Sequence, residues 1–211
     1  KPSLGPIANW GLEIEKNAAN PNPNSFYGRG FAKYNLKDYR GAILDFDKAI
    51  ELKPTYFDAF IARGQSYSKQ ENHKVAIQDY NEAIRLNPLE ATAYFSRGIS
   101  KAKLANHRGA LSDFNKSLEL NAEYAPCWAA RGEAKSHLAD YKGSIEDFDK
   151  AVEISPKRSN YLSNRGFSKM KLADFQAALK DFEEAIKNVN KSVTNEYLIS
   201  YDKWMKEFGS I

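Results

Sequence analysis

The chain has 211 residues, of which 42% are hydrophobic and 13% aromatic, so it has enough apolar side chains for a packed interior and is not intrinsically disordered. Its formal net charge of +4 is too small for a dedicated nucleic-acid-binding domain, and no apolar run is long enough to predict a membrane span or insertion. The single cysteine, Cys127, excludes an internal disulfide, and the compartment stays undetermined.

Residues 1–22 form the least regular segment. Ala8 and Leu12 fall where the second helix of a preceding unit would place them, and a turn cluster follows from Asn20 to Asn24. We expect a degenerate half repeat here, with a segment folded back into a groove as the alternative. The chain begins at Lys1 without methionine, which indicates an excised domain or a mature form.

The rest of the chain is dominated by an Arg-Gly pair that recurs every 34 residues. The five glycines of these pairs are Gly30, Gly64, Gly98, Gly132 and Gly166. A fixed period of this length indicates one supersecondary unit copied and stacked on itself. The predicted units are residues 23–56, 57–90, 91–124, 125–158 and 159–192.

Aligning the units on the glycine shows the internal pattern of each. A small residue lies 12 positions after it, an aromatic residue 16 after it and a second small residue 19 after it, as in Ala42, Phe46 and Ala49. These spacings put all three on one helix face. Eight residues after the glycine, an Asp or Asn is placed to cap this second helix. Pro54, Pro88 and Pro156 are predicted to end it.

This pattern resembles the tetratricopeptide repeat, over roughly residues 23–192. The resemblance implies an all-α, right-handed solenoid of about five helix-turn-helix repeats, whose first helices line a concave face. In one column the chain departs from the family pattern: Lys33 and its equivalents replace an aromatic residue in four of five units, which predicts a more basic surface there. Pentatricopeptide repeats, which read single-stranded RNA, are the nearest alternative, but they have a 35-residue period.

The carboxylates, histidines and cysteine that could carry chemistry are predicted to have structural roles. Asp45 and its four equivalents recur 15 residues after each glycine, and we predict that they pair with the recurring arginines as a ladder. Five equivalent carboxylates indicate architecture, whereas general acid–base catalysis needs a special pair in one pocket. His73 and His107 share a column with aromatic rings, and Cys127 shares one with alanines. No spacing suits a metal ion, so we expect no enzyme activity, cofactor or metal.

The resemblance places the positions three before and one after each glycine on the concave face. They form an apolar floor that we predict to bind a partner, and the selected residues are Tyr27, Phe31, Ile61, Gln65, Phe95, Ile99, Glu133 and Phe167. One helical turn further along lies a basic edge made of Lys69, Lys103 and Lys171. The inward Lys, Asn and Arg clamp of chaperone-tail adaptors is absent from these positions.

The predicted function is therefore a non-catalytic scaffold that binds a peptide or helix of another protein, apolar with some acidic character. The alternatives are a regulatory or targeting domain of a larger enzyme and a self-assembling structural protein. Residues 193–211 carry Tyr197, Tyr201, Trp204 and Phe208 at helical spacing, which predicts a C-terminal capping helix.

Overall fold

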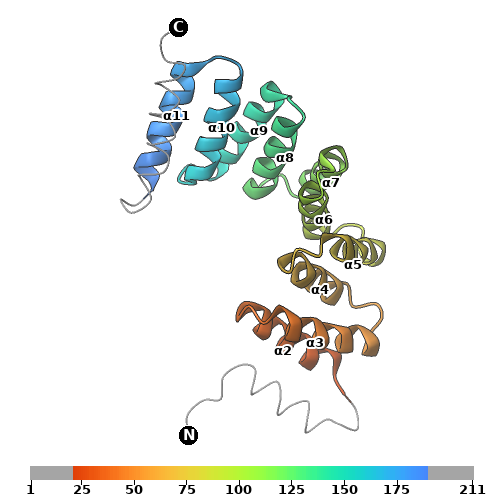
Figure 1. Ribbon diagram of the computed structural model, residues 1–211. Coiled ribbons are helices and arrows are strands. Elements are labelled where there is room, and N and C mark those ends of the chain that lie inside the picture. Colours follow the sequence, from red (N-terminus) through yellow and green to blue (C-terminus); the bar gives the residue numbers. More distant parts are fainter. Residues whose placement is uncertain (1–20, 190–211) are drawn as a thin grey trace, which may run out of the picture. The chain divides into compact units, whose positions relative to one another are not determined.

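The computed structural model describes residues 21–189, which form ten α-helices and no strand (Figure 1). These residues belong to two compact units that divide after Ala122. The expected half repeat in residues 1–22 and the capping helix in residues 193–211 lie outside the described residues, except for the last two positions of the former.

The first unit contains three helix pairs, and the second contains two. The helices of the first unit are α2 (Pro23–Asn35), α3 (Tyr39–Leu52), α4 (Phe57–Lys69), α5 (His73–Leu86), α6 (Ala91–Lys103) and α7 (His107–Leu120). Those of the second are α8 (Ala125–His137), α9 (Tyr141–Ile154), α10 (Ser159–Lys171) and α11 (Phe175–Asn188). Each pair reproduces the predicted repeat: a first helix that carries the Arg-Gly pair, a short turn, and a second helix that carries the aromatic residue.

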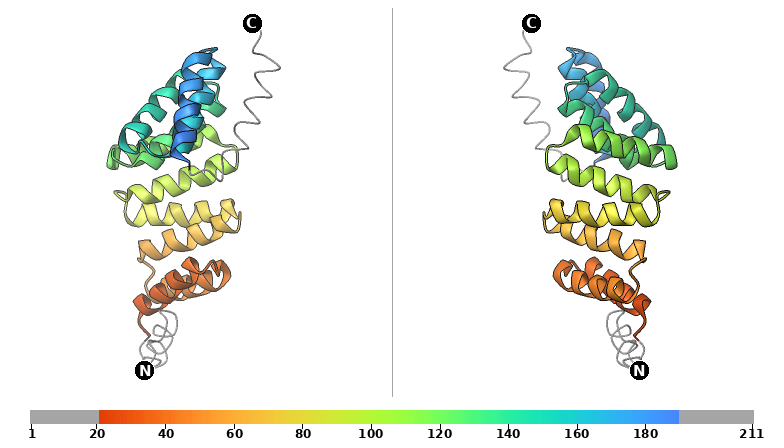
Figure 2. Two further views of the ribbon diagram at one scale, coloured as in Figure 1. Left: turned by 90° about the vertical axis from the view of Figure 1, so that its left-hand side faces the viewer. Right: turned by 90° about the vertical axis from the view of Figure 1, so that its right-hand side faces the viewer.

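Within the first unit, the first helices lie on the inner side of the stack. Helix α4 contacts α2 and α6 as well as its partner α5, whereas among the described residues the second helices make no comparable contacts with one another. The side-by-side arrangement of these helices is visible in Figure 2. The exposed face of α2, α4 and α6 is therefore the surface on which a groove can form.

The recurring glycine is the point of closest approach between the two helices of a repeat. A Cβ atom on Gly64 would lie 2.7 Å from the ring of Tyr80, and one on Gly98 would lie 2.6 Å from the ring of Phe114. Real side chains do not tolerate such distances, so no larger residue fits without movement of the ring. The glycine of the Arg-Gly pair therefore allows the two helices of a repeat to pack closely.

The expected N-caps are present in four of the five second helices. Asp38, Asn106, Asp140 and Asp174 each accept a hydrogen bond from the backbone N–H three residues later. The prediction was wrong for Asn72, whose side chain makes no capping hydrogen bond. The prolines are also not needed to end the second helix, because α7 ends at Leu120 in the same register without one.

The turn inside each repeat has a residue in the left-handed region, which the sequence did not reveal. These residues are Lys37, Glu71, Ala105, Ala139 and Ala173, with φ between 60° and 65°. In the first turn, the N–H of Asp38 donates to the carbonyl of Lys33 and that of Lys37 to the carbonyl of Tyr34. This pattern closes the first helix in the manner of a Schellman motif, although none of the five residues is glycine.

Candidate functional site

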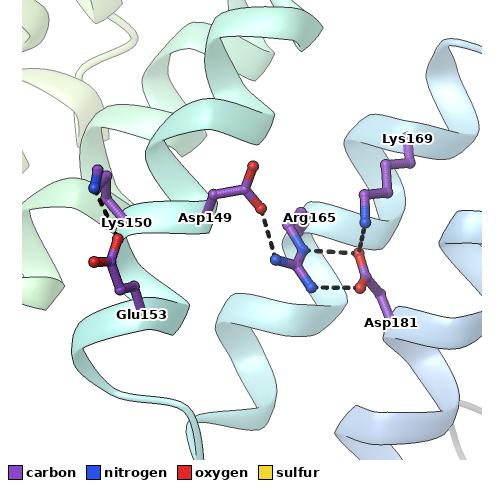
Figure 3. Close-up of polar contacts among 6 residues, drawn as sticks. All are labelled: Asp149, Lys150, Glu153, Arg165, Lys169 and Asp181. Carbon is purple, nitrogen blue, oxygen red and sulfur yellow. Dashed lines mark hydrogen bonds and ion pairs between the residues drawn. The ribbon is translucent and has the colours of Figure 1, made fainter.

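A buried carboxylate joins the two helices of each repeat through an ion network. In the last repeat, Arg165 donates from Nε and Nη2 to both oxygens of Asp181 at 2.9 and 2.6 Å, and Lys169 lies 2.8 Å from the same carboxylate (Figure 3). Arg165 also donates from Nη1 to Asp149 of the preceding repeat at 2.6 Å. The predicted ladder therefore links helices both within a repeat and between neighbouring repeats.

The same network recurs in the other repeats and changes the interpretation of one lysine column. Arg29, Arg63, Arg97 and Arg131 bind Asp45, Asp79, Asp113 and Asp147 in the same two-pronged way. Lys33, Lys101 and Lys135 add a second cation to three of these carboxylates, as Lys169 does in the last repeat. The lysines expected to make this surface more basic are thus half-buried, and each is paired with an internal carboxylate that it shares with an arginine.

The second repeat lacks this second cation because Tyr67 occupies the lysine position. Its carboxylate, Asp79, is left with Arg63 alone, which also donates to Asp47 at 2.6 Å. Burial raises the pKa of Asp79, the Arg63 guanidinium opposes this increase, and the charge of Asp47 adds to it. Asp79 therefore has one cationic partner fewer among the described residues than each of its four equivalents.

An aromatic cluster covers the exposed face of α2. Phe31 is 47% exposed and stacks against Tyr27 and Tyr34, with ring centroids 6.3 and 6.5 Å away. Tyr27 in turn packs on Tyr56 at 5.1 Å, and burial raises the pKa of Tyr27 to about 12. The packed tyrosines hold Phe31 at the surface, as an anchor for a ligand requires.

The equivalent positions on α4 and α6 are less exposed. Ile61 is 8% exposed and belongs to a packed cluster with Phe60, Ala83 and Ala93. It therefore supports the floor from below and does not form its surface. Gln65, Phe95 and Ile99 are half-buried, and the Phe95 ring lies 6.1 Å from that of Phe114 in a tilted arrangement.

The second unit presents one exposed ring and one exposed carboxylate at the predicted positions. Phe167 on α10 is exposed and makes an edge contact with Phe182 at 5.4 Å. Glu133 on α8 is exposed and accepts a hydrogen bond from Asn164 at 2.9 Å. Both residues belong to the first helix of their repeat.

The lysines of the predicted basic edge are exposed. Lys69 and Lys103 lie in the first unit and Lys171 in the second, and none forms an ion pair with a residue in 21–189. Across the same residues there is no group of three or more side chains suited to a metal ion. No helix in this part of the chain has the length and apolarity needed to cross a bilayer.

Together, the pairs, their glycine contacts and their capped turns define a protein built from stacked helical hairpins. Tetratricopeptide repeat models match residues 23–56, 57–89 and 125–158. The chain belongs to the tetratricopeptide repeat family. Residues 91–124 and 159–188 form the same helix pair with the same glycine contact, so the repeats extend beyond the matched segments. A model of the Vps4 C terminal oligomerisation domain matches residues 163–209, which include most of α10 and all of α11.

The solved structures similar to this chain include two that are described as TPR proteins. YrrB, described as a TPR protein with an unusual peptide-binding site, superposes with a TM-score of 0.72 and 18% identity over 93% of this chain and 99% of its own. MamA gives a TM-score of 0.70 and 21% identity over 75% of this chain and 93% of its own. PilF of Pseudomonas aeruginosa gives a TM-score of 0.74 and 13% identity over 90% of this chain and 93% of its own. No curated protein sequence matched the chain.

Proposed function

We propose that the protein is a non-catalytic scaffold whose first unit binds a peptide or helix of a partner protein across the face of α2, α4 and α6. The partner carries apolar anchors and some acidic residues. The observation that supports this most directly is the exposed Phe31 ring, supported on two sides by packed tyrosines. Apolar rings fixed at a surface are typical anchors of protein interfaces.

The neighbouring repeats complement this anchor. Gln65 and Ile99 lie at the position of Phe31 in the next two repeats, so a bound segment meets one polar and one aliphatic side chain beyond the ring. Lys69 and Lys103 have no acidic partner among residues 21–189 and can pair with carboxylates of the segment. This combination favours an extended or helical ligand that lies across the repeats.

The test begins with selection of a displayed peptide library on the immobilised protein. We expect enrichment of peptides with aromatic or aliphatic anchors near Asp or Glu, and the affinity of one such synthetic peptide is then measured by fluorescence anisotropy. Phe31→Ser removes the anchor and should weaken binding roughly 10- to 100-fold, since burying a Phe side chain contributes about 1.5–3 kcal/mol.

The matched control is Leu44→Ser. Leu44 is also exposed but lies on the second helix α3, away from the proposed groove, so the affinity should stay unchanged. Equal losses for both variants, or enrichment of peptides without apolar anchors, would contradict the proposal. Phe95→Ala is a poorer probe, because Phe95 packs on Phe114 and its loss disturbs the core.

The family match over residues 163–209 favours self-association as a second candidate function, through the C-terminal part of the chain. Light scattering over a concentration series tests it. A mass that rises with concentration is expected, and a monomer at every concentration rejects it.

A further inference from the structure

The turns that join the two helices of each repeat carry an unusual row of cations in the first unit. Arg40, Lys74 and Arg108 occupy the second position of α3, α5 and α7, and all three are exposed. The same turns hold three further exposed cations: Lys37, Lys69 and Lys103. None of the six forms an ion pair with a described residue.

These turns contain the whole excess charge of the first unit. Residues 35–41, 69–75 and 103–109 hold six cations and two carboxylates, whereas the remainder of residues 21–122 holds nine of each. One of the two carboxylates, Asp38, is engaged in capping α3. Because α2, α4 and α6 run in the same direction in successive repeats, the three turns lie along one edge of the stack (Figure 2).

The position of these cations is unfavourable for the helices themselves. The N-terminus of a helix carries partial positive charge, so acidic residues are preferred in its first turn and basic residues toward its end. Helices α3, α5 and α7 have no acidic residue in the first turn, and each has a cation there. Helix α9 also breaks this rule, through Lys142, but only the turns of the first unit hold two cations each that have no acidic partner among the described residues, and this indicates a role toward an external anion.

Apolar side chains project from two of the same turns. Leu36 is 71% exposed and Leu104 is 42% exposed, and each directly precedes the left-handed residue of its turn. The edge therefore combines cations with leucines at its tips. This composition is typical of surfaces that adsorb to anionic membranes, where leucines enter the headgroup region and cations meet the lipid charge.

We infer that this turn edge of the first unit, defined by residues 35–41, 69–75 and 103–109, binds peripherally to an anionic lipid surface. The cations lie on three separate turns and do not converge on a pocket. An extended anionic surface such as a membrane can therefore contact all three turns at once. Single-stranded nucleic acid needs exposed rings for its bases. The rings of this edge are half-buried: Tyr39 packs on Tyr34, and Nδ1 of His73 lies 3.2 Å from Oγ of Ser68.

The second unit shows that the cationic edge is not a property of the fold. Its corresponding turns, residues 137–143 and 171–177, each contain one lysine and one aspartate and are neutral. The same backbone turn is thus built with and without excess charge in one chain. The turn edge shares Lys69 and Lys103 with the basic edge of the groove, but the lipid surface is a different ligand and also meets Arg40, Lys74 and Arg108, so the inference goes beyond the proposed function.

The experiment is co-sedimentation of the full chain with vesicles of phosphatidylcholine alone and of phosphatidylcholine mixed with phosphatidylserine. We expect binding only to the mixed vesicles, with release by added salt. The variant Arg40→Gln, Lys74→Gln, Arg108→Gln should bind the mixed vesicles roughly 100-fold more weakly. Replacing Leu36 and Leu104 by Ser in the otherwise wild-type chain should also weaken the binding.

The matched control removes the same number of charges from the same three helices. Lys48, Arg85 and Lys116 pair with glutamates three residues away, so their replacement by Gln leaves the turn edge intact and should leave vesicle binding within a few-fold of wild type. Equal losses in both triple variants would overturn the inference in favour of unspecific charge attraction. The inference would also be overturned if the folded wild-type chain did not bind vesicles. The same holds if it bound an acidic peptide or single-stranded RNA in a salt-sensitive way and did not bind vesicles.

Discussion

Arg165 has two acidic partners that differ in burial, and this difference allows a controlled test of the ion ladder (Figure 3). The side chain of Asp181 is 6% exposed and also binds Lys169, whereas that of Asp149 is 55% exposed and within the described part of the chain pairs only with Arg165. We compare Asp181→Asn with Asp149→Asn. Both variants lose one charge and keep nearly the same shape.

The two substitutions should differ in cost by roughly 2 kcal/mol. Asp181→Asn leaves two mostly buried cations without their carboxylate, and removing one partner of such a pair costs about 3–5 kcal/mol when burial is complete. Because Arg165 and Lys169 keep some contact with water, we expect about 2–3 kcal/mol. Asp149→Asn should cost less than about 1 kcal/mol. A precedent is Asn81, which accepts from Arg97 Nη1 at 2.7 Å in the equivalent place.

The assay is urea unfolding followed by circular dichroism, combined with amide hydrogen exchange of α10 and α11. Exchange is needed because repeats can unfold locally and not as one cooperative unit. Asp181→Asn should accelerate exchange in both helices, and Asp149→Asn should leave it close to wild type. Equal effects of the two variants would refute the argument that burial, and not mere proximity to Arg165, gives the ladder its strength.

Three further predictions concern other elements of the repeat. Tyr67→Lys supplies the missing cation, so it should lower the pKa of Asp79 and raise the free energy of unfolding at neutral pH by about 0.5–1 kcal/mol. This gain in stability should vanish as the pH falls through the folded-state pKa of Asp79. Urea denaturation of both proteins at neutral and at acidic pH measures it. Gly98→Ala should lower the free energy of unfolding by about 1–3 kcal/mol, and by more than Gly132→Ala does. The added Cβ would lie 2.6 Å from its nearest neighbour at Gly98 but 3.2 Å at Gly132. Similar melting temperatures of the two variants would contradict this. Ala105→Gly relieves a left-handed backbone at φ 60° and should stabilise by up to about 1 kcal/mol in urea unfolding, whereas a loss would show that the turn is unstrained.

The fold could be predicted because the same contacts recur in each repeat. The contact between Gly98 and Phe114 has an equivalent in each of the five repeats, always between residues 16 positions apart. One physical argument therefore applied to all five repeats. The left-handed turn residues could not be found in this way. They are Lys, Glu or Ala, none of which marks positive φ in a sequence, and the turn closes through backbone hydrogen bonds.

The candidate site was less predictable from the sequence. The position of a residue within the aligned repeats determines which helix face it lies on, but not how far its side chain is buried. Tyr27 and Ile61 share a column, yet Ile61 is covered by the next repeat while Tyr27 remains half-exposed. Exposure depends on the sizes of neighbouring side chains, which differ between repeats. The lysine column was misread for a related reason: Lys101 can be free or paired, and only the 2.8 Å distance to Asp113 decides between the two.

The pairing of internal charges also gives meaning to the small net charge. An excess of +4 spread evenly over the chain would exert little directed attraction on a partner. Each buried aspartate pairs with one or two cations, however, and exposed helix pairs such as Lys48 with Glu51 engage further cations. Apart from Lys53, which lies over the Tyr56 ring, the cations of residues 21–122 that form no ion pair with a described residue lie on the turn edge, while the exposed ring of Phe31 lies on the face of α2. The two proposed surfaces share Lys69 and Lys103 but otherwise use different residues of the same repeats: Phe31 belongs to the groove, whereas Arg40, Lys74 and Arg108 belong to the turn edge.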